Sequence, residues 1–146
     1  MIQKLLTSNE VVRLATIGVG IGATIFGLVP MIAPRFFCRS FGVPIPGDPA
    51  SDVLVRSVSS RDMINGIGII SAAIHGGRVG PWLIARAVAD GTDAATIVIA
   101  YASGVKGWRL GLLGVMAAGA TVVDLLLYQA NKSFSISGPT NPVGNP

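Results

Sequence analysis

Residues 11–32 read VVRLATIGVGIGATIFGLVPMI and contain one charged side chain, that of Arg13. A helix needs about 20 mostly apolar residues to cross the hydrocarbon core of a bilayer. Glu10, preceded by Ser8 and Asn9, suits the start of a helix, and the prolines at positions 30 and 34 mark its end. The stretch therefore predicts a membrane-spanning helix.

Three further apolar segments of similar length follow, at about residues 52–74, 81–101 and 108–128. The whole chain is 51% hydrophobic and only 12% charged, whereas soluble domains carry about a quarter charged residues. The sequence predicts an all-α fold, a four-helix transmembrane bundle. One domain covers residues 1–130, and a polar tail rich in Pro and Gly covers residues 131–146. We expect a multi-pass integral membrane protein, in an endomembrane if the cell is eukaryotic.

A soluble alternative rests on GVGIGA at residues 18–23, which resembles a dinucleotide-binding turn. That turn requires a preceding strand and an acidic residue about twenty positions later, and neither is convincing. The small residues of this segment, among them Gly18, Gly20, Gly22 and Gly27, suit close packing of helices in lipid better.

The stretch RAVADGTDAATIV, residues 86–98, places three charged residues inside the third apolar segment. Arg86, Asp90 and Asp93 share one face of a helix, because residues three, four and seven apart lie on the same side. Each charge facing lipid at the bilayer centre would cost about 2.5 to 3.5 kcal/mol. These side chains are therefore expected inside the bundle, opposite Arg61 and Asp62 of the second segment.

Charges within the expected spans do not balance. Beyond their first three residues, the spans hold three arginines, at positions 56, 61 and 86, and four aspartates, at positions 62, 90, 93 and 124. In a poorly hydrated interior one carboxyl group would lack a cationic partner and would keep a proton near neutral pH, which is the property of a general acid or base. The predicted catalytic residues are Asp62, Asp90, Asp93, Arg61 and Arg86, and the predicted supporting residues are Arg56, Asn65, Thr96, Asp124 and Tyr128.

Other chemistries find less support. The chain has one histidine, His75, and one cysteine, Cys38, which argues against a zinc site. DGTD at residues 90–93 offers two carboxylates for Mg²⁺ and a diphosphate, but Arg86 beside them would repel the metal. The net charge of +4 comes without a basic run or a basic-aromatic cluster, so nucleic acid is not an expected partner. The sequence predicts neither a cofactor nor a metal.

Several short motifs resemble a known family. The motifs are similar to those of small four-helix membrane proteins from bacteria and filamentous fungi. They are FGVP at residues 41–44, the arginine at position 56, RDMINGIG at residues 61–68 and an aspartate at position 90 or 93. That family is catalogued as a domain of unknown function. The resemblance covers about residues 11–128 and implies that Arg61, Asp62 and Gly66 belong to the family's site. It also implies secondary metabolism, because some fungal relatives lie among such genes. Asp124 and the Pro-rich tail depart from the pattern.

Two functions remain open. The first is a cofactor-independent isomerase or cyclase that takes a lipophilic small molecule from the membrane lipids and uses an aspartate as acid or base. The second is a non-enzymatic role, as an assembly subunit, a lipophile-binding protein or a proton-coupled carrier, with the charges forming an ion-pair network that sets helix register. A homo-oligomer is compatible with either function. A ligand-sized cavity between the helices would favour an enzyme or a binding protein, and a closed, fully paired ionic core would favour the structural role.

Overall fold

The protein is all-helical in the part of the chain that the computed structural model describes, residues 8–136. Four long helices correspond to the four apolar segments of the sequence, and one short helix lies between the first two. The elements are α1 (Ser8–Ile32), α2 (Pro34–Ser40), α3 (Pro49–His75), α4 (Gly80–Ala102) and α5 (Trp108–Ile136). The fold class predicted from the sequence, all-α, is confirmed.

Helix α5 extends beyond its expected end at residue 128 and includes the first residues of the expected tail. Asn131 gives one reason, because its Nδ2 donates hydrogen bonds to the Leu127 carbonyl and to the Thr16 hydroxyl of α1. These contacts hold the last turns of α5 against the start of α1. Residues 137–146, the rest of the predicted tail, lie outside the described residues.

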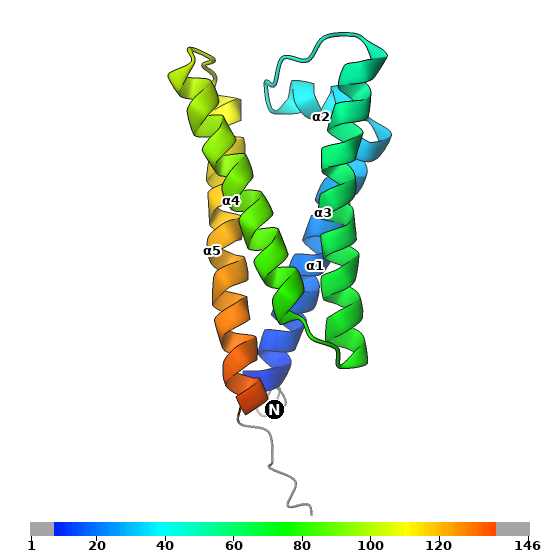
Figure 1. The fold of residues 1–146 in the computed structure, drawn as a ribbon, viewed down its shortest axis with the longest axis vertical. Coiled ribbons are helices and arrows are strands. Elements are labelled where there is room, and N and C mark those ends of the chain that lie inside the picture. Colours follow the sequence, from blue (N-terminus) through cyan, green and yellow to red (C-terminus); the bar gives the residue numbers. More distant parts are fainter. Residues whose placement is uncertain (1–7, 137–146) are drawn as a thin grey trace, which may run out of the picture.

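The long helices form two pairs, with α1 packed along α3 and α4 packed along α5 (Figure 1). Contacts between the pairs are much sparser than contacts within them. In Figure 1 the pairs approach each other at the end where α4 begins and diverge toward the end where α2 lies.

Glycines allow α1 and α3 to touch through their backbones. A Cβ atom at Gly66 would lie 2.6 Å from the Gly20 carbonyl oxygen and 2.6 Å from the Thr24 nitrogen, and one at Gly27 would lie 2.6 Å from the Met63 nitrogen. The prediction of close packing through small residues is confirmed at Gly20 and Gly27. It is wrong at positions 18 and 22, where a Cβ atom would meet no atom within 4 Å.

The segment between α1 and α3 folds back as α2 and is held by local contacts. Pro34 begins α2, and an ion pair of 3.0 Å joins Arg35 to Asp52 in the first turn of α3. The Asp48 carboxylate caps α3 by accepting a hydrogen bond of 3.0 Å from the Ser51 nitrogen. The ion pair holds α2 against the start of α3, and α2 also packs on α1.

Two of the long helices have the length and composition of membrane spans. They are Asn9–Ile32, with mean hydropathy 1.9, and Trp108–Lys132, with mean hydropathy 2.1, and most of their residues are not buried within the fold. The sequence predicted four such helices. Helices α3 and α4 do not qualify by composition, because Arg56, Arg61 and Asp62 interrupt the first and three charges between residues 86 and 93 interrupt the second.

Candidate functional site

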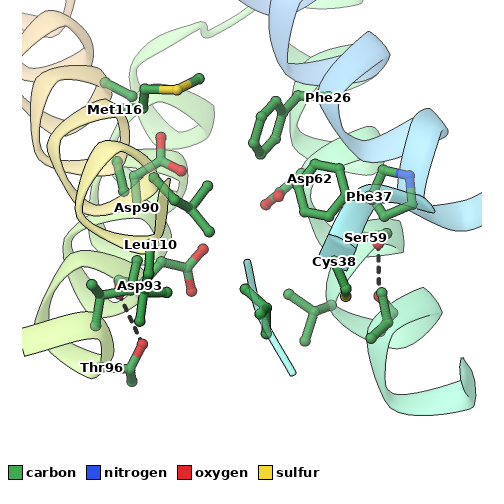
Figure 2. Close-up of a pocket in the computed structure, with 18 of the residues that line it drawn as sticks. Phe26, Phe37, Cys38, Ser59, Asp62, Asp90, Asp93, Thr96, Leu110 and Met116 are labelled. Atoms are coloured by element: carbon green, nitrogen blue, oxygen red, sulfur yellow. Dashed lines mark hydrogen bonds between the residues drawn. The ribbon is translucent and has the colours of Figure 1, made fainter. Parts of the chain in front are cut away.

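A cavity of about 560 Å³ lies between the two helix pairs, below α2 (Figure 2). This volume falls in the range of pockets that bind small molecules. Side chains from all five helices line it, and most of them are apolar. The lining residues with polar side chains are Cys38, Ser59, Asp62, Arg86, Asp90, Asp93 and Thr96. Figure 2 shows Asp62 on one side of the cavity, with Asp90 and Asp93 on the opposite side.

Arg61 forms the first of two ionic clusters. Its Nη2 lies 2.7 Å from Oδ2 of Asp93 on α4, and its Nε donates a hydrogen bond of 3.1 Å to Oδ1 of its neighbour Asp62. The contact with Asp93 joins the α1–α3 pair to the α4–α5 pair. About a third of the side chain is exposed in both Arg61 and Asp93, so this cluster is partly open to the surroundings.

Arg86 forms the second, more deeply buried cluster. Its Nη1 donates hydrogen bonds of 2.8 and 3.1 Å to the two carboxylate oxygens of Asp124 on α5. Its Nη2 lies 3.3 Å from Oδ2 of Asp90, one helical turn later, as the spacing in the sequence predicts. The Asp124 side chain is fully buried. Each arginine therefore holds one carboxylate from its own helix and one from the next long helix.

The Asp90 carboxylate is incompletely satisfied. Its Oδ2 atom is buried and has no hydrogen-bond partner, because the nearby Arg86 nitrogen is in ionic contact without hydrogen-bond geometry. Asp90 as a whole is only 9% exposed and lines the cavity. A buried oxygen without a partner is rare in folded proteins, and such groups often have a chemical role.

The structure separates the predicted site residues into three groups. The first group lines the cavity and consists of Asp62, Asp90, Asp93, Arg86 and Thr96. The Thr96 hydroxyl donates a hydrogen bond to the Asp93 carbonyl. Arg61 and Asp124 do not line it, but they bind carboxylate or guanidinium groups that do.

The third group lies away from the cavity. Arg56 is exposed, and its Nε donates a hydrogen bond of 3.1 Å to the Met31 carbonyl near the end of α1. Asn65 is buried in α3 without lining the cavity, and the Tyr128 ring lies beside Gly80 at the start of α4. Arg56 therefore lies outside the two ionic clusters, because its long side chain reaches back to the end of α1.

Sequence reasoning missed the walls of the cavity. Phe26 of α1 and Phe37 of α2 line it and stack edge to face, with ring centroids 5.1 Å apart. Cys38 lines it beside them and is 4% exposed. Residues 35–42 read RFFCRSFG, and nothing in these letters shows which side of α2 faces the cavity.

Cys38 brings a thiol to the cavity wall. Burial raises the pKa of this thiol, and the negative charge of Asp52 raises it further. The group is therefore a neutral thiol at physiological pH rather than a nucleophilic thiolate. Across residues 8–136, no three His, Cys, Asp or Glu side chains are grouped so that they could hold a metal ion.

The sequence profile of one protein family, described as a domain of unknown function (DUF4267), matches residues 20–132. The chain belongs to this family. The match includes α2 to α4 entirely, most of α1 and α5, and every residue that lines the cavity. The resemblance inferred from the sequence motifs is thus confirmed at the level of the family. Comparison with curated proteins and with solved structures found no match.

Proposed function

We propose that all four long helices of the protein cross a membrane. Large apolar side chains cover the outer faces of the two charged helices as well as those of the other two. Examples are Val53 of α3, which is 57% exposed, and Val98 of α4, which is 67% exposed. In water such surfaces would be unfavourable, whereas lipid tails would cover them. The charged side chains in the middle of α3 and α4 form ion pairs with each other or with Asp124 of α5, which removes the main objection to placing these helices in lipid.

Aromatic residues support the same arrangement. Trp82 and Tyr101 stand nineteen residues apart on α4, which corresponds to about 28 Å at 1.5 Å per residue. This length is close to the thickness of the hydrocarbon core, and Trp and Tyr favour its two boundaries. Asp90 then lies near the middle of the membrane.

We further propose that the protein is a cofactor-independent acid-base enzyme, an isomerase or cyclase, acting on a lipophilic small molecule. The observation that carries this proposal is the cavity of about 560 Å³, with apolar walls and with the unsatisfied Asp90 carboxylate among its lining residues. A purely structural ion-pair network has no need of a ligand-sized space beside it. An open cavity next to incompletely paired carboxylates is instead typical of a binding or catalytic site.

The chemistry needs nothing beyond the side chains present. One carboxyl group, which we assign to Asp90, gives a proton to the substrate, and a second carboxylate, Asp62 or Asp93, removes a proton from another atom. Substrate and product then have the same composition, so the reaction is an isomerisation or a cyclisation. Arg61 and Arg86 keep the carboxylates in position through the contacts of 2.7 to 3.3 Å described above.

The first experiment compares metabolites by mass spectrometry. Membranes containing the wild-type chain, the Asp90→Asn variant or the Asp48→Asn variant are fed a panel of lipophilic precursors. Asp48→Asn is the matched control, because the same chemical change is made outside the cavity at a position where Asn also caps a helix. We expect an isomerised product with the wild type and the control and at least a 100-fold loss with Asp90→Asn. Asp93→Asn should also abolish turnover. Equal profiles at equal protein levels would contradict the enzyme proposal.

A second comparison tests the cavity without changing any charge. Gly22 lines the cavity and has open space beside it, whereas Gly18, one turn earlier on α1, has open space but does not line the cavity. Gly22→Leu should therefore fill part of the cavity and lower turnover or ligand binding, while Gly18→Leu should not. If both variants keep full function, the cavity is not the site. If charge substitutions lower only stability or assembly, the structural role replaces the proposal.

A further inference from the structure

The cavity carries a surplus of negative groups. Its two ionic clusters contain four carboxylates, and each cluster has only one guanidinium group. Arg56, which would have reduced the surplus, donates its hydrogen bond elsewhere. Four carboxylates with two arginines therefore leave two negative charges uncompensated when all groups are ionised. In a region of low dielectric constant such a surplus attracts either protons or another cation.

The unsatisfied oxygen of Asp90 shows where that cation would bind. Once Asp90 has given up its proton, its carboxylate can only accept hydrogen bonds, so the partner that Oδ2 then lacks must be a donor. A charged donor makes the strongest such bond. Lysine is absent from the residues that line the cavity, and the lining Arg86 is already bound to Asp90 and Asp124. The donor is therefore expected to come from a ligand.

The walls are compatible with a positive charge as well. Phe26 and Phe37 both line the cavity, and their aromatic faces attract cations electrostatically. The remaining wall is mostly apolar and suits a hydrocarbon chain or ring system. The cavity thus combines an anionic region, an aromatic surface and a large apolar volume.

We infer that the cavity selects lipophiles whose head group carries or develops a positive charge beside Asp90. A protonated amine is the stable form of such a head, and a substrate that becomes cationic when it accepts a proton is the reactive form. This inference rests on the proposed function, because it names the substrate class for the same site. It predicts that a lipophilic ammonium ion binds as an analogue of the cationic intermediate.

Protection of Cys38 measures binding directly. Cys38 lines the cavity and is the only cysteine of the chain, so a bound ligand should slow its reaction with a small neutral maleimide. The full chain is purified in an uncharged maltoside detergent. Three probes of equal chain length are compared, namely decylamine, decanol and decanoate, with labelling followed by mass spectrometry. We expect decylamine to protect at a concentration at least about 10-fold lower than decanol, with decanoate the weakest.

Variants separate binding at Asp90 from partitioning of the probes into detergent. Asp90→Asn should reduce the advantage of decylamine over decanol to less than about threefold and leave protection by decanol unchanged, while Asp48→Asn should behave as the wild type. If Asp90→Asn does not fold, Asp93→Asn removes a second charge from the same cavity and should shift the preference in the same direction.

The outcomes distinguish the two proposals. Equal protection by decylamine and decanol, or stronger protection by decanoate, would overturn the inference about charge while leaving lipophile binding intact. An advantage of decylamine that persists in both charge variants would also overturn it. Failure of all three probes to protect Cys38 would refute lipophile binding in the cavity, and both proposals with it.

Discussion

The contact between α1 and α3 leads to a sharp prediction for Gly66→Ala. A Cβ atom at this position would lie 2.6 Å from two backbone atoms of α1, whereas ordinary contacts begin at 3.4 Å. The helices would have to separate locally by about 0.8 Å, and backbone atoms cannot move aside as the end of a flexible side chain can. Overpacking of this kind typically destabilises a protein by about 1 to 3 kcal/mol. Asp62 lies one turn before Gly66 and would move with α3.

The matched control is Gly18→Ala on α1. Nothing lies within 4 Å of a Cβ atom at Gly18, and Ala favours a helix over Gly by at most about 1 kcal/mol. The two substitutions are chemically identical, but the first should lower the free energy of unfolding and the second should leave it equal or raise it. We expect a difference of about 1 to 3 kcal/mol between the variants, because the gain in helix propensity is common to both and the overpacking is not.

Unfolding in mixed micelles, followed by circular dichroism as the fraction of dodecyl sulfate increases, measures this difference. Labelling of Cys38 reports at the same time whether the cavity has changed shape. Equal free energies of unfolding for Gly66→Ala and Gly18→Ala would show that the backbones of α1 and α3 are not in contact. The α1–α3 contact would then not fix the position of Asp62.

Three further predictions concern the charged and titrating groups. Arg86→Met should lower the free energy of unfolding by about 3 to 5 kcal/mol, because it leaves the fully buried Asp124 without a cation. Adding Asp124→Asn to this variant should restore at least half of that loss. Additive effects of the two changes would contradict the Arg86–Asp124 ion pair. Burial raises the pKa of Cys38, so its maleimide labelling rate should still increase above about pH 8.5, the ordinary pKa of a thiol, and a plateau below that pH would contradict its burial. Hydrogen bonds from Ser51 lower the pKa of Asp48, so Asp48→Ala should lower the thermal unfolding midpoint at neutral pH. That difference should shrink as the pH falls below about 4, where protonation removes the same cap from the wild type, and a difference unaffected by pH would exclude the charged cap.

Local features of the chain were accessible from the sequence because they depend on residues close together along it. Apolar length identified the four long helices, and helical spacing placed Arg86 beside Asp90, where the structure has an ion pair of 3.3 Å. The cost of exposing charge to lipid indicated that Arg61 and Asp93 face inward, and the structure joins them. The number of helices with the composition of a membrane span was predicted as four, whereas two have it. Segment length alone does not account for the charges within α3 and α4.

Contacts between helices depend on how each helix is rotated about its axis and on which helix it packs against. The spacing of residues within one helix predicts neither. Arg86 binds Asp124 because α4 packs along α5, and Arg61 reaches from α3 to Asp93 on α4, which links the two helix pairs. Arg56 of α3 instead donates its hydrogen bond to the Met31 carbonyl near the end of α1. The sequence by itself thus determined the helices and the charges on their faces, through local periodicity and the cost of burying charge. Only the tertiary structure decided the pairing of those charges, the unsatisfied oxygen of Asp90 and the cavity, because these arise where helices distant in the chain pack together or diverge.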